Sequence, residues 1–366
     1  MATFRTLRDL EQSVAAAGLQ SHLPAIIATV RPVILFVRAR EPDDALPVGT
    51  TKLGGHPNLP AGMAWPMRPA YRDAEKRRQR LMKETEASRK FNAQLAEDKT
   101  FSLVQRDSFR NLTKSTEAWN KARAEFGFQP FPLAFVAQFS LAALSRDPGF
   151  PIEFPDTGLL SIFQDIIGGG EVRVTWHDQP VETLQSAKPP QQLVDWYDRF
   201  TPLGLYTSDN EQWRHQTGAD VLQPFSALAV PDHWENAYPY DTPLWHAFRN
   251  WIGTEAGQKL NYRPEGPLGS QPNLSGNFGD RLGGWPANIQ SPPEPDLAAQ
   301  LIIGNHTIVP GKTTWFHLFS HAGEYYGGTR FMPRAHSGDG TSYILIRDTD
   351  LAARRFERIG QDYQMD

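Results

Sequence analysis

The chain has 366 residues, a formal net charge of −4 and no cysteine, and 40% of its residues are hydrophobic. This length allows two domains with a sizeable core, and the missing cysteines exclude disulfides, thiolate catalysis and cysteine metal ligands. The weakly negative charge gives no overall attraction to nucleic acid, so we expect no nucleic-acid partner. The 29 glycines, 30 prolines and 21 phenylalanines favour short strands and ordered loops over a helical bundle.

The segment 1–23 has no apolar stretch and contains Asp9 and Glu11, so it does not read as a signal peptide. No run of about 18 apolar residues occurs, so we expect no transmembrane helix and no membrane partner. The expected location is the cytoplasm of a bacterium, and the sequence leaves the oligomeric state open.

The first predicted element is a helix that begins after Thr6, whose hydroxyl is placed to accept the backbone N–H of Asp9. Gly18 is placed to end this helix. A short helix over 23–30 and a buried strand over 33–37 follow. The apolar face of the first helix comprises Leu7, Leu10 and Val14.

A loop rich in glycine and proline extends over 54–66, where paired glycines permit positive φ angles. Trp65 is expected to anchor this loop to the core. Further elements are predicted as strands over 132–141, 158–164, 171–177 and 341–346, and as helices over 191–200, 242–252 and 350–359. Residues 263–295 show little periodicity and predict a long functional or mobile loop.

Residues 68–127 differ from the rest of the chain in composition. Between Arg68 and Glu125 there are 15 Lys/Arg and 9 Asp/Glu, a local charge of +6 that leaves −10 for the remainder. We expect a helical hairpin that turns near 98–107. A solvated helix pair is the favoured interpretation of its charge, and a surface for a protein partner is the alternative. One predicted helical face comprises Phe109, Leu112, Thr116, Trp119 and Phe126.

An internal duplication is the main pattern in the sequence. The motif at 52–57 (KLGGHP) recurs at 281–286 (RLGGWP), and each copy is followed by a similar apolar segment that ends in Asp. We therefore expect two pseudo-repeats, over 1–200 and 201–366, in one compact unit. The first motif lies 46 residues farther from its apolar segment than the second does, so 68–127 is interpreted as an insertion.

Several motifs, taken in order, resemble the YwqG-like family, a bacterial domain of unknown function. They are 52–57 with Trp65-Pro66, 132–138 (PLAFVAQ) and 156–160 (DTGLL), and the second half is similar over 283–290 and 338–352. The resemblance implies an α+β fold of mostly antiparallel β-sheets in two pseudo-repeats with peripheral helices, and it implies no reaction. The chain departs from the family at the inserted hairpin and at 317–321 (HLFSH).

The paired glycines suggest an anion site, because successive backbone N–H groups beside Lys52 and Arg281 attract negative charge. The alternative is that each loop only makes a tight turn, since no helix begins after it. The full candidate ligand-binding set is Lys52, Gly54, Gly55, His56, Gln138, Arg281, Gly283, Gly284, Trp285, Gln290 and Arg330.

A metal site at His317, His321 and Glu324 is a weaker alternative, because two histidines at this spacing share a face on a helix or on a strand. No Glu follows His317, so the zincin signature is absent. Hydrogen-bonded histidines are the favoured interpretation, and we expect no metal and no cofactor.

Two functions remain open. The first is a non-catalytic protein- or ligand-binding protein, with the 68–127 hairpin as a partner-specific arm and a toxin or effector as one possible partner. The second is a hydrolase or lyase that acts on an anionic substrate in a cleft between the repeats, with or without a metal. No Gly-x-Ser-x-Gly elbow occurs, so nucleophilic catalysis has little support.

Overall fold

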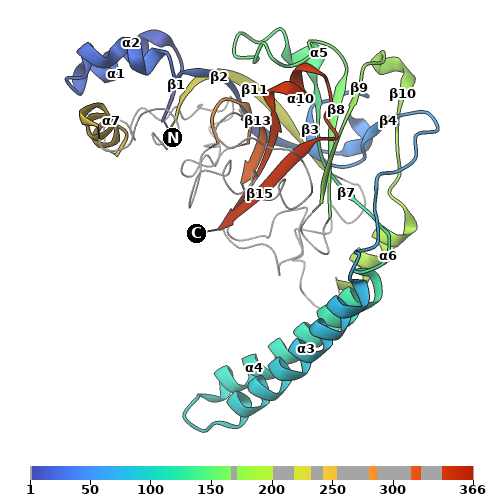
Figure 1. Ribbon diagram of the computed structural model, residues 1–366. Helices are drawn as coiled ribbons and strands as arrows, with labels where there is room; N and C mark the ends of the chain where they lie inside the picture. The colour runs from blue at the N-terminus through green and yellow to red at the C-terminus, as the bar shows by residue number, and fades with distance from the viewer. Residues whose placement is uncertain are drawn as a thin grey trace.

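The computed structural model describes residues 2–165, 171–200, 218–231, 242–253, 280–286, 315–322 and 340–365. Its main feature is a single sheet of antiparallel strands that takes strands from both halves of the chain (Figure 1). The expected α+β class with mostly antiparallel sheets is confirmed. The strands, in spatial order, are β15 (Ile359–Met365), β14 (Gly340–Arg347), β13 (Trp315–Ala322), β12 (Arg281–Gly283), β2 (Arg31–Glu41), β11 (Ala219–Val230), β3 (Lys52–Gly54), β7 (Ala134–Ser140), β8 (Leu159–Gln164) and β9 (Val172–His177), with β1 (Ala2–Phe4) paired to β11.

The strand pairings on one side of the centre of this sheet are repeated, in the same register, on the other side. The centre is the pair Val37 and Gln223, where β2 meets β11. Strand β3 pairs with β11 in the register in which β12 pairs with β2, and the β7–β8 and β13–β14 pairs follow in equivalent positions. Both of these outer pairs contain a bulge, between Phe135 and Ala137 and between His317 and Phe319. The two sides of the sheet therefore share their order, direction and irregularity.

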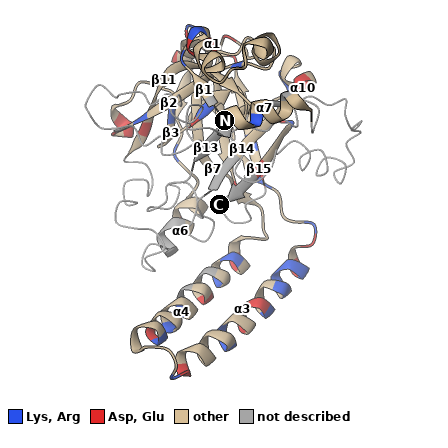
Figure 2. Ribbon diagram, turned by 90° about the vertical axis from the view of Figure 1, so that its left-hand side faces the viewer, with Lys and Arg blue, Asp and Glu red and all other residues tan. Residues whose placement is uncertain are grey.

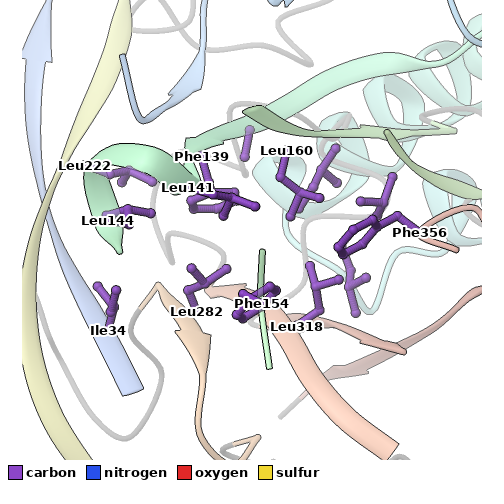
Figure 3. Close-up of a cluster of buried hydrophobic side chains, with 14 of the residues drawn as sticks. Ile34, Phe139, Leu141, Leu144, Phe154, Leu160, Leu222, Leu282, Leu318 and Phe356 are labelled. Atoms are coloured by element: carbon purple, nitrogen blue, oxygen red, sulfur yellow. The ribbon is translucent and has the colours of Figure 1, made fainter. Parts of the chain in front are cut away.

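The main core lies on one face of the sheet and takes side chains from both halves of the chain. Ile34 and Leu160 meet Leu282 and Leu318 there, as Figure 3 shows. Phe356 closes the far side, with its ring centroid 5.9 Å from that of Trp176 on β9. The sheet is thus curled, because strongly twisted strands close on themselves when one face is apolar.

A second, smaller core packs α1 (Leu7–Ala16), α2 (Leu23–Ile27) and α7 (Pro243–Gly253) around β1. The predicted capping box at Thr6 and Asp9 is present. Of the predicted apolar face, Leu10 and Val14 are fully buried, whereas Leu7 is 43% exposed. Leu7 is the first helical residue and lies at the end of the packed face.

The predicted helical hairpin is present and projects far from the sheet (Figures 1 and 2). It consists of α3 (Ala74–Glu97) and α4 (Leu103–Phe126), each 24 residues long and so about 36 Å in length. A capping box at Ser102 and Gln105 begins α4 directly after the turn. We call residues 74–126 the arm. Among the described residues, no helix is long and apolar enough to cross a membrane.

Shorter elements complete the fold. They are α5 (Leu141–Leu144), α6 (Gln191–Phe200), α10 (Asp348–Ala352), β4 (Asn58–Pro60) paired with β10 (Leu184–Ser186), β5 (Met67–Arg68) paired with β6 (Phe131–Pro132), and 3₁₀ turns at Gln20–His22, Asp43–Ala45 and Val181–Thr183. The predicted helix over 350–359 is wrong beyond Ala352. Arg354 adopts a φ of 58°, which ends the helix before β15.

Candidate functional site

The first glycine motif closes over a buried carboxylate rather than over an open anion site. Gly54 and Gly55 both have a φ of 69°, which turns the chain sharply after β3. A Cβ atom on Gly55 would lie 2.1 Å from Asp43 Oδ1, so only glycine lets the backbone approach this carboxylate. Asp43 was not predicted as part of this site, because its contact with the motif depends on this turn.

Asp43 is the centre of a buried polar cluster. Lys52 forms an ion pair with one carboxylate oxygen, and both side chains are almost fully enclosed. The other oxygen accepts the backbone N–H of His56 at 2.8 Å and contacts His56 Nδ1 at 2.8 Å. Burial alone would raise the pKa of Asp43, but hydrogen bonds from His56 and Lys52 outweigh it and hold that pKa below its ordinary value. Burial also lowers the pKa of Lys52.

An Asp–His pair can orient a general base in enzymes, but this one is enclosed. The Nε2 atom of His56 is buried without a hydrogen-bond partner among the described residues. Asp43 is shared between His56 and Lys52, so its negative charge is already balanced. The arrangement therefore ties the loop to β3 and presents no exposed reactive atom.

Gln138 extends this polar layer beneath the glycine loop. Its side chain is fully buried, and it accepts the backbone N–H of Asn58 at 2.9 Å while donating to Thr50 O at 2.8 Å and Asn58 Oδ1 at 2.7 Å. Asn58 Oδ1 also accepts the backbone N–H of Gly49. Because these amide groups satisfy one another, they hold the loop in place. The predicted anchor Trp65 is confirmed, since its Nε1 donates to Leu133 O at 2.8 Å.

The second glycine motif has the same backbone shape with different packing. Gly283 and Gly284 have φ angles of 74° and 70°, and a Cβ atom on Gly284 would lie 2.8 Å from Val33 Cβ. Arg281 is buried at 3% exposure. Trp285, in the position of His56, donates from Nε1 to a backbone carbonyl and lies under the Arg31 guanidinium, 3.6 Å from the ring centroid. The residues of the second motif are therefore also packed against the protein body.

The two glycine motifs lie at opposite ends of the sheet and do not form one cleft. Gly54 pairs with Ala219, which pairs with Glu41 at the end of β2, whereas Gly283 pairs with Val33 near its start. Glu41 and Val33 are eight residues apart, which is about 26 Å along a strand. Lys52 and Arg281 themselves lie on β3 and β12, with β2 and β11 between them, and Lys52 is already paired with Asp43.

The remaining candidate residues are not brought together by the described part of the chain. Gln290, Glu324 and Arg330 lie outside the described residues. His317 and His321 lie on β13 as expected, and the pairing of β13 with β14 is irregular between 317 and 319. No group of potential metal ligands occurs within the described ranges.

The root of the arm contains a buried ionic network that the sequence did not reveal. Arg68 Nε lies 3.0 Å from Asp165 Oδ2, and each side chain is 1% exposed. The same guanidinium donates to Pro69 O and Gly127 O, at the two ends of the arm. Tyr71 donates its hydroxyl to Asp165 at 2.8 Å. Burial, followed by the nearby Asp165 charge, raises the pKa of Tyr71 above its ordinary value.

This network fixes the direction of the arm. Arg68 and Tyr71 stack with the guanidinium carbon 4.4 Å from the ring centroid, and Arg77 lies 4.6 Å from the same ring. Phe126 at the end of α4 packs edge-on against Phe131 and against Trp196 of α6. Both helices of the hairpin are therefore anchored to the body at their root, and this anchoring sets the direction in which the arm projects.

The arm also holds much of the exposed apolar surface. Five of the ten large apolar side chains that are exposed in the described part of the chain belong to it. Exposed apolar groups of this kind mark protein contact sites when they gather on one element. They are Met82 at 53%, Phe91 at 60%, Leu103 at 68%, Val104 at 77% and Leu112 at 54%.

Comparison with known protein families matches residues 51–364 to a domain of unknown function, DUF1963. The matched region begins just before the first glycine motif and includes the arm, whereas α1, α2 and β2 precede it. No curated protein matches the chain. Because the match covers most of its length, the protein belongs to this family, the DUF1963 domain of unknown function.

Proposed function

We propose that this protein is a non-catalytic protein-binding module and that the arm carries its contact surface. The single observation behind this proposal is the gathering of exposed apolar side chains on an element that projects from the body. A helix that packs only against one neighbour normally turns such residues inward. Their exposure on the arm favours a partner that covers them.

The buried root supports the same function. An arm held by Arg68, Asp165 and Tyr71 presents its surface in a fixed direction. Binding then loses less conformational entropy than it would with a loosely tethered helix pair, and this favours affinity. The glycine motifs, whose polar groups are enclosed, support the body that carries the arm.

The catalytic alternative receives less support. It placed Lys52, Arg281 and Arg330 around one anionic substrate, but Lys52 and Arg281 are buried on β3 and β12 with β2 and β11 between them, and Lys52 is already paired with Asp43. We further propose that the matching registers of the two sides arose by internal duplication, with 68–127 as an insertion. The finer likeness to YwqG-like proteins and a toxin or effector as partner stay predictions.

Site-specific photo-crosslinking in cells tests the proposal. A benzophenone amino acid at position 91 of the full chain should give a discrete crosslinked protein. The same probe at Ile152, which is 90% exposed on the body, serves as the control. A crosslink that is specific to position 91, and that is lost when residues 74–126 are replaced by a short linker, supports the proposal. Equal products at both positions, or none at position 91, would refute it.

A further inference from the structure

The seam between the two helices of the arm is polar. Thr85 and Asn92 on α3 face α4, and Asn120 donates from Nδ2 to Thr85 Oγ1 at 2.9 Å. Thr113, also half-buried, donates its hydroxyl to its own helix at Phe109 O. A two-helix coil normally places apolar residues in these positions. On α3 these polar residues share the buried positions with Leu81 and Ala96.

One flank of the arm is occupied by ion pairs. Arg89 on α3 lies 4.0 Å from Glu117 on α4, and Arg110 reaches Asp107 at 2.6 Å and Ala96 O at 3.5 Å. These contacts show that the side of α3 with Arg89 and the side of α4 with Glu117 lie on the same flank of the hairpin. Met82 precedes Arg89 by one heptad and so lies on this flank as well. We call it the ionic flank.

Phe91 and Leu112 lie on the opposite flank. Each helix turns by about 100° per residue, so the seam separates Phe91 from Arg89 on α3 and Leu112 from Glu117 on α4. Phe91 is 60% and Leu112 54% exposed. These two apolar residues are thus displaced from the seam to the side opposite Arg89 and Glu117, as in a helix that belongs to a three-helix bundle. We call this side the apolar flank.

At the root, the apolar flank is already covered by a helix. Phe126 follows Leu112 by two heptads, so it lies on the same side of α4. Its ring packs at 6.0 Å from Trp196 of α6, which is fully buried. Helix α6 contains Asp195 and Asp198 and is itself an amphipathic helix with a net negative charge. At the root, the element that packs against the apolar flank is thus an amphipathic helix with a net negative charge.

The charge of the arm favours an acidic partner. Residues 74–126 contain 13 Lys/Arg and 8 Asp/Glu, a net charge of +5. Two arms packed flank to flank would bring +5 against +5, which disfavours a second copy of the chain as the occupant. An acidic partner gains attraction along the arm and apolar contact at Phe91 and Leu112.

We propose that an acidic amphipathic helix of a partner protein lies along the apolar flank, beyond α6, and completes a three-helix bundle with α3 and α4. This inference rests on the proposed function and names the class of partner. The partner helix inserts its apolar face between Phe91 and Leu112, while its carboxylates lie near the basic residues of the arm. The mode is helix-in-groove recognition.

Methyl NMR of the full chain tests this inference with a synthetic amphipathic peptide of about 21 residues, three heptads, in which glutamates surround an apolar stripe. The Leu112 methyls should shift on titration, while the ε-methyl of Met82 on the ionic flank should not. A peptide with every Glu replaced by Gln should bind at least tenfold more weakly. The Phe91→Ser variant, which keeps the Leu112 methyls as the reporter, should abolish the shift and retain wild-type helical content by circular dichroism, because the Phe91 side chain is exposed.

Three results would overturn the inference. They are no shift of the Leu112 methyls, a shift of the Met82 methyl as large as that of Leu112, or Gln and Lys versions of the peptide that bind as tightly as the Glu peptide. The crosslinking experiment separates this outcome from failure of the proposed function. A crosslinked partner at position 91 together with silent peptides leaves the arm as a contact surface and removes the acidic helix as its ligand. Shifts caused by anionic vesicles but not by the acidic peptide would assign the flank to membranes and would also overturn the inference.

Discussion

Arg68 and Asp165 form an ion pair that is almost completely shielded from water at the point where the arm meets the sheet. Taking two charges out of water is costly, so such a pair persists only with good geometry and further hydrogen bonds. Further hydrogen bonds are present here, since Arg68 also donates to Pro69 O and Gly127 O and Asp165 accepts from Tyr71. The pair joins the two ends of the arm to β8 and so determines where the arm points.

Arg68→Met should destabilise the protein strongly, because it leaves Asp165 buried without its cation. The expected loss in the free energy of unfolding is about 3–5 kcal/mol, measured by urea denaturation near pH 7. Arg80→Met removes an exposed ion pair with Glu84 on the same helix and should lower the free energy of unfolding far less. Similar losses in the two variants would contradict a buried root network.

Gly55→Ala should be much more damaging than Gly62→Ala. Both glycines have positive φ, 69° and 76°, so an alanine is strained at either position by about 1–2 kcal/mol. At Gly62 nothing lies within 4 Å of the added Cβ, but at Gly55 the new atom meets the Asp43 carboxylate. Thermal denaturation of both variants checks this difference, and equal melting temperatures would show that Asp43 does not constrain the loop.

Asp43 should make the protein sensitive to acid in a defined range. Its pKa lies below the ordinary value of 3.8 in the folded protein. A carboxylate with a lowered pKa therefore stabilises the folded state above pH 3.8, and this contribution is lost as the pH falls through the folded pKa. Asp43→Asn should cost about 3 kcal/mol at pH 6, with the difference from wild type shrinking below pH 3.8.

The neighbouring Asp44→Asn provides the control for this titration, because Asp44 is exposed on the same turn. Its effect on the free energy of unfolding should be small at every pH. A wild-type advantage over Asp43→Asn that persists unchanged down to pH 2.5 would show that the ion pair with Lys52 is not the source of the stability.

The elements that followed local rules were predictable from the sequence. Thr6 and Asp9 form the expected capping box, and the hairpin follows from a breaker-free charged stretch with an apolar period. Strand β11 was not predicted, and it contains Pro224, a residue that is unusual in a central strand. The structure accommodates this proline opposite Phe36, whose own N–H is directed away from β11 to Asp280 O at 3.0 Å.

The candidate site was harder to predict, because it depends on contacts between distant segments. Lys52 was selected for its place beside paired glycines, but its partner Asp43 and its burial follow from the turn at Gly54 and Gly55. Likewise, nothing in the sequence pairs Arg68 with Asp165 across the whole arm. Repeated motifs predicted two similar units, yet only the sheet order shows that their loops face opposite ends.

The most direct test of the arm as contact surface is the affinity of the crosslinked partner for three versions of the full chain, measured by calorimetry. Wild type and Met82→Ser should bind alike, since Met82 lies on the ionic flank. Phe91→Ser/Leu112→Ser should bind at least tenfold more weakly. Undiminished binding by the double variant, or an equal loss in Met82→Ser, would contradict the account.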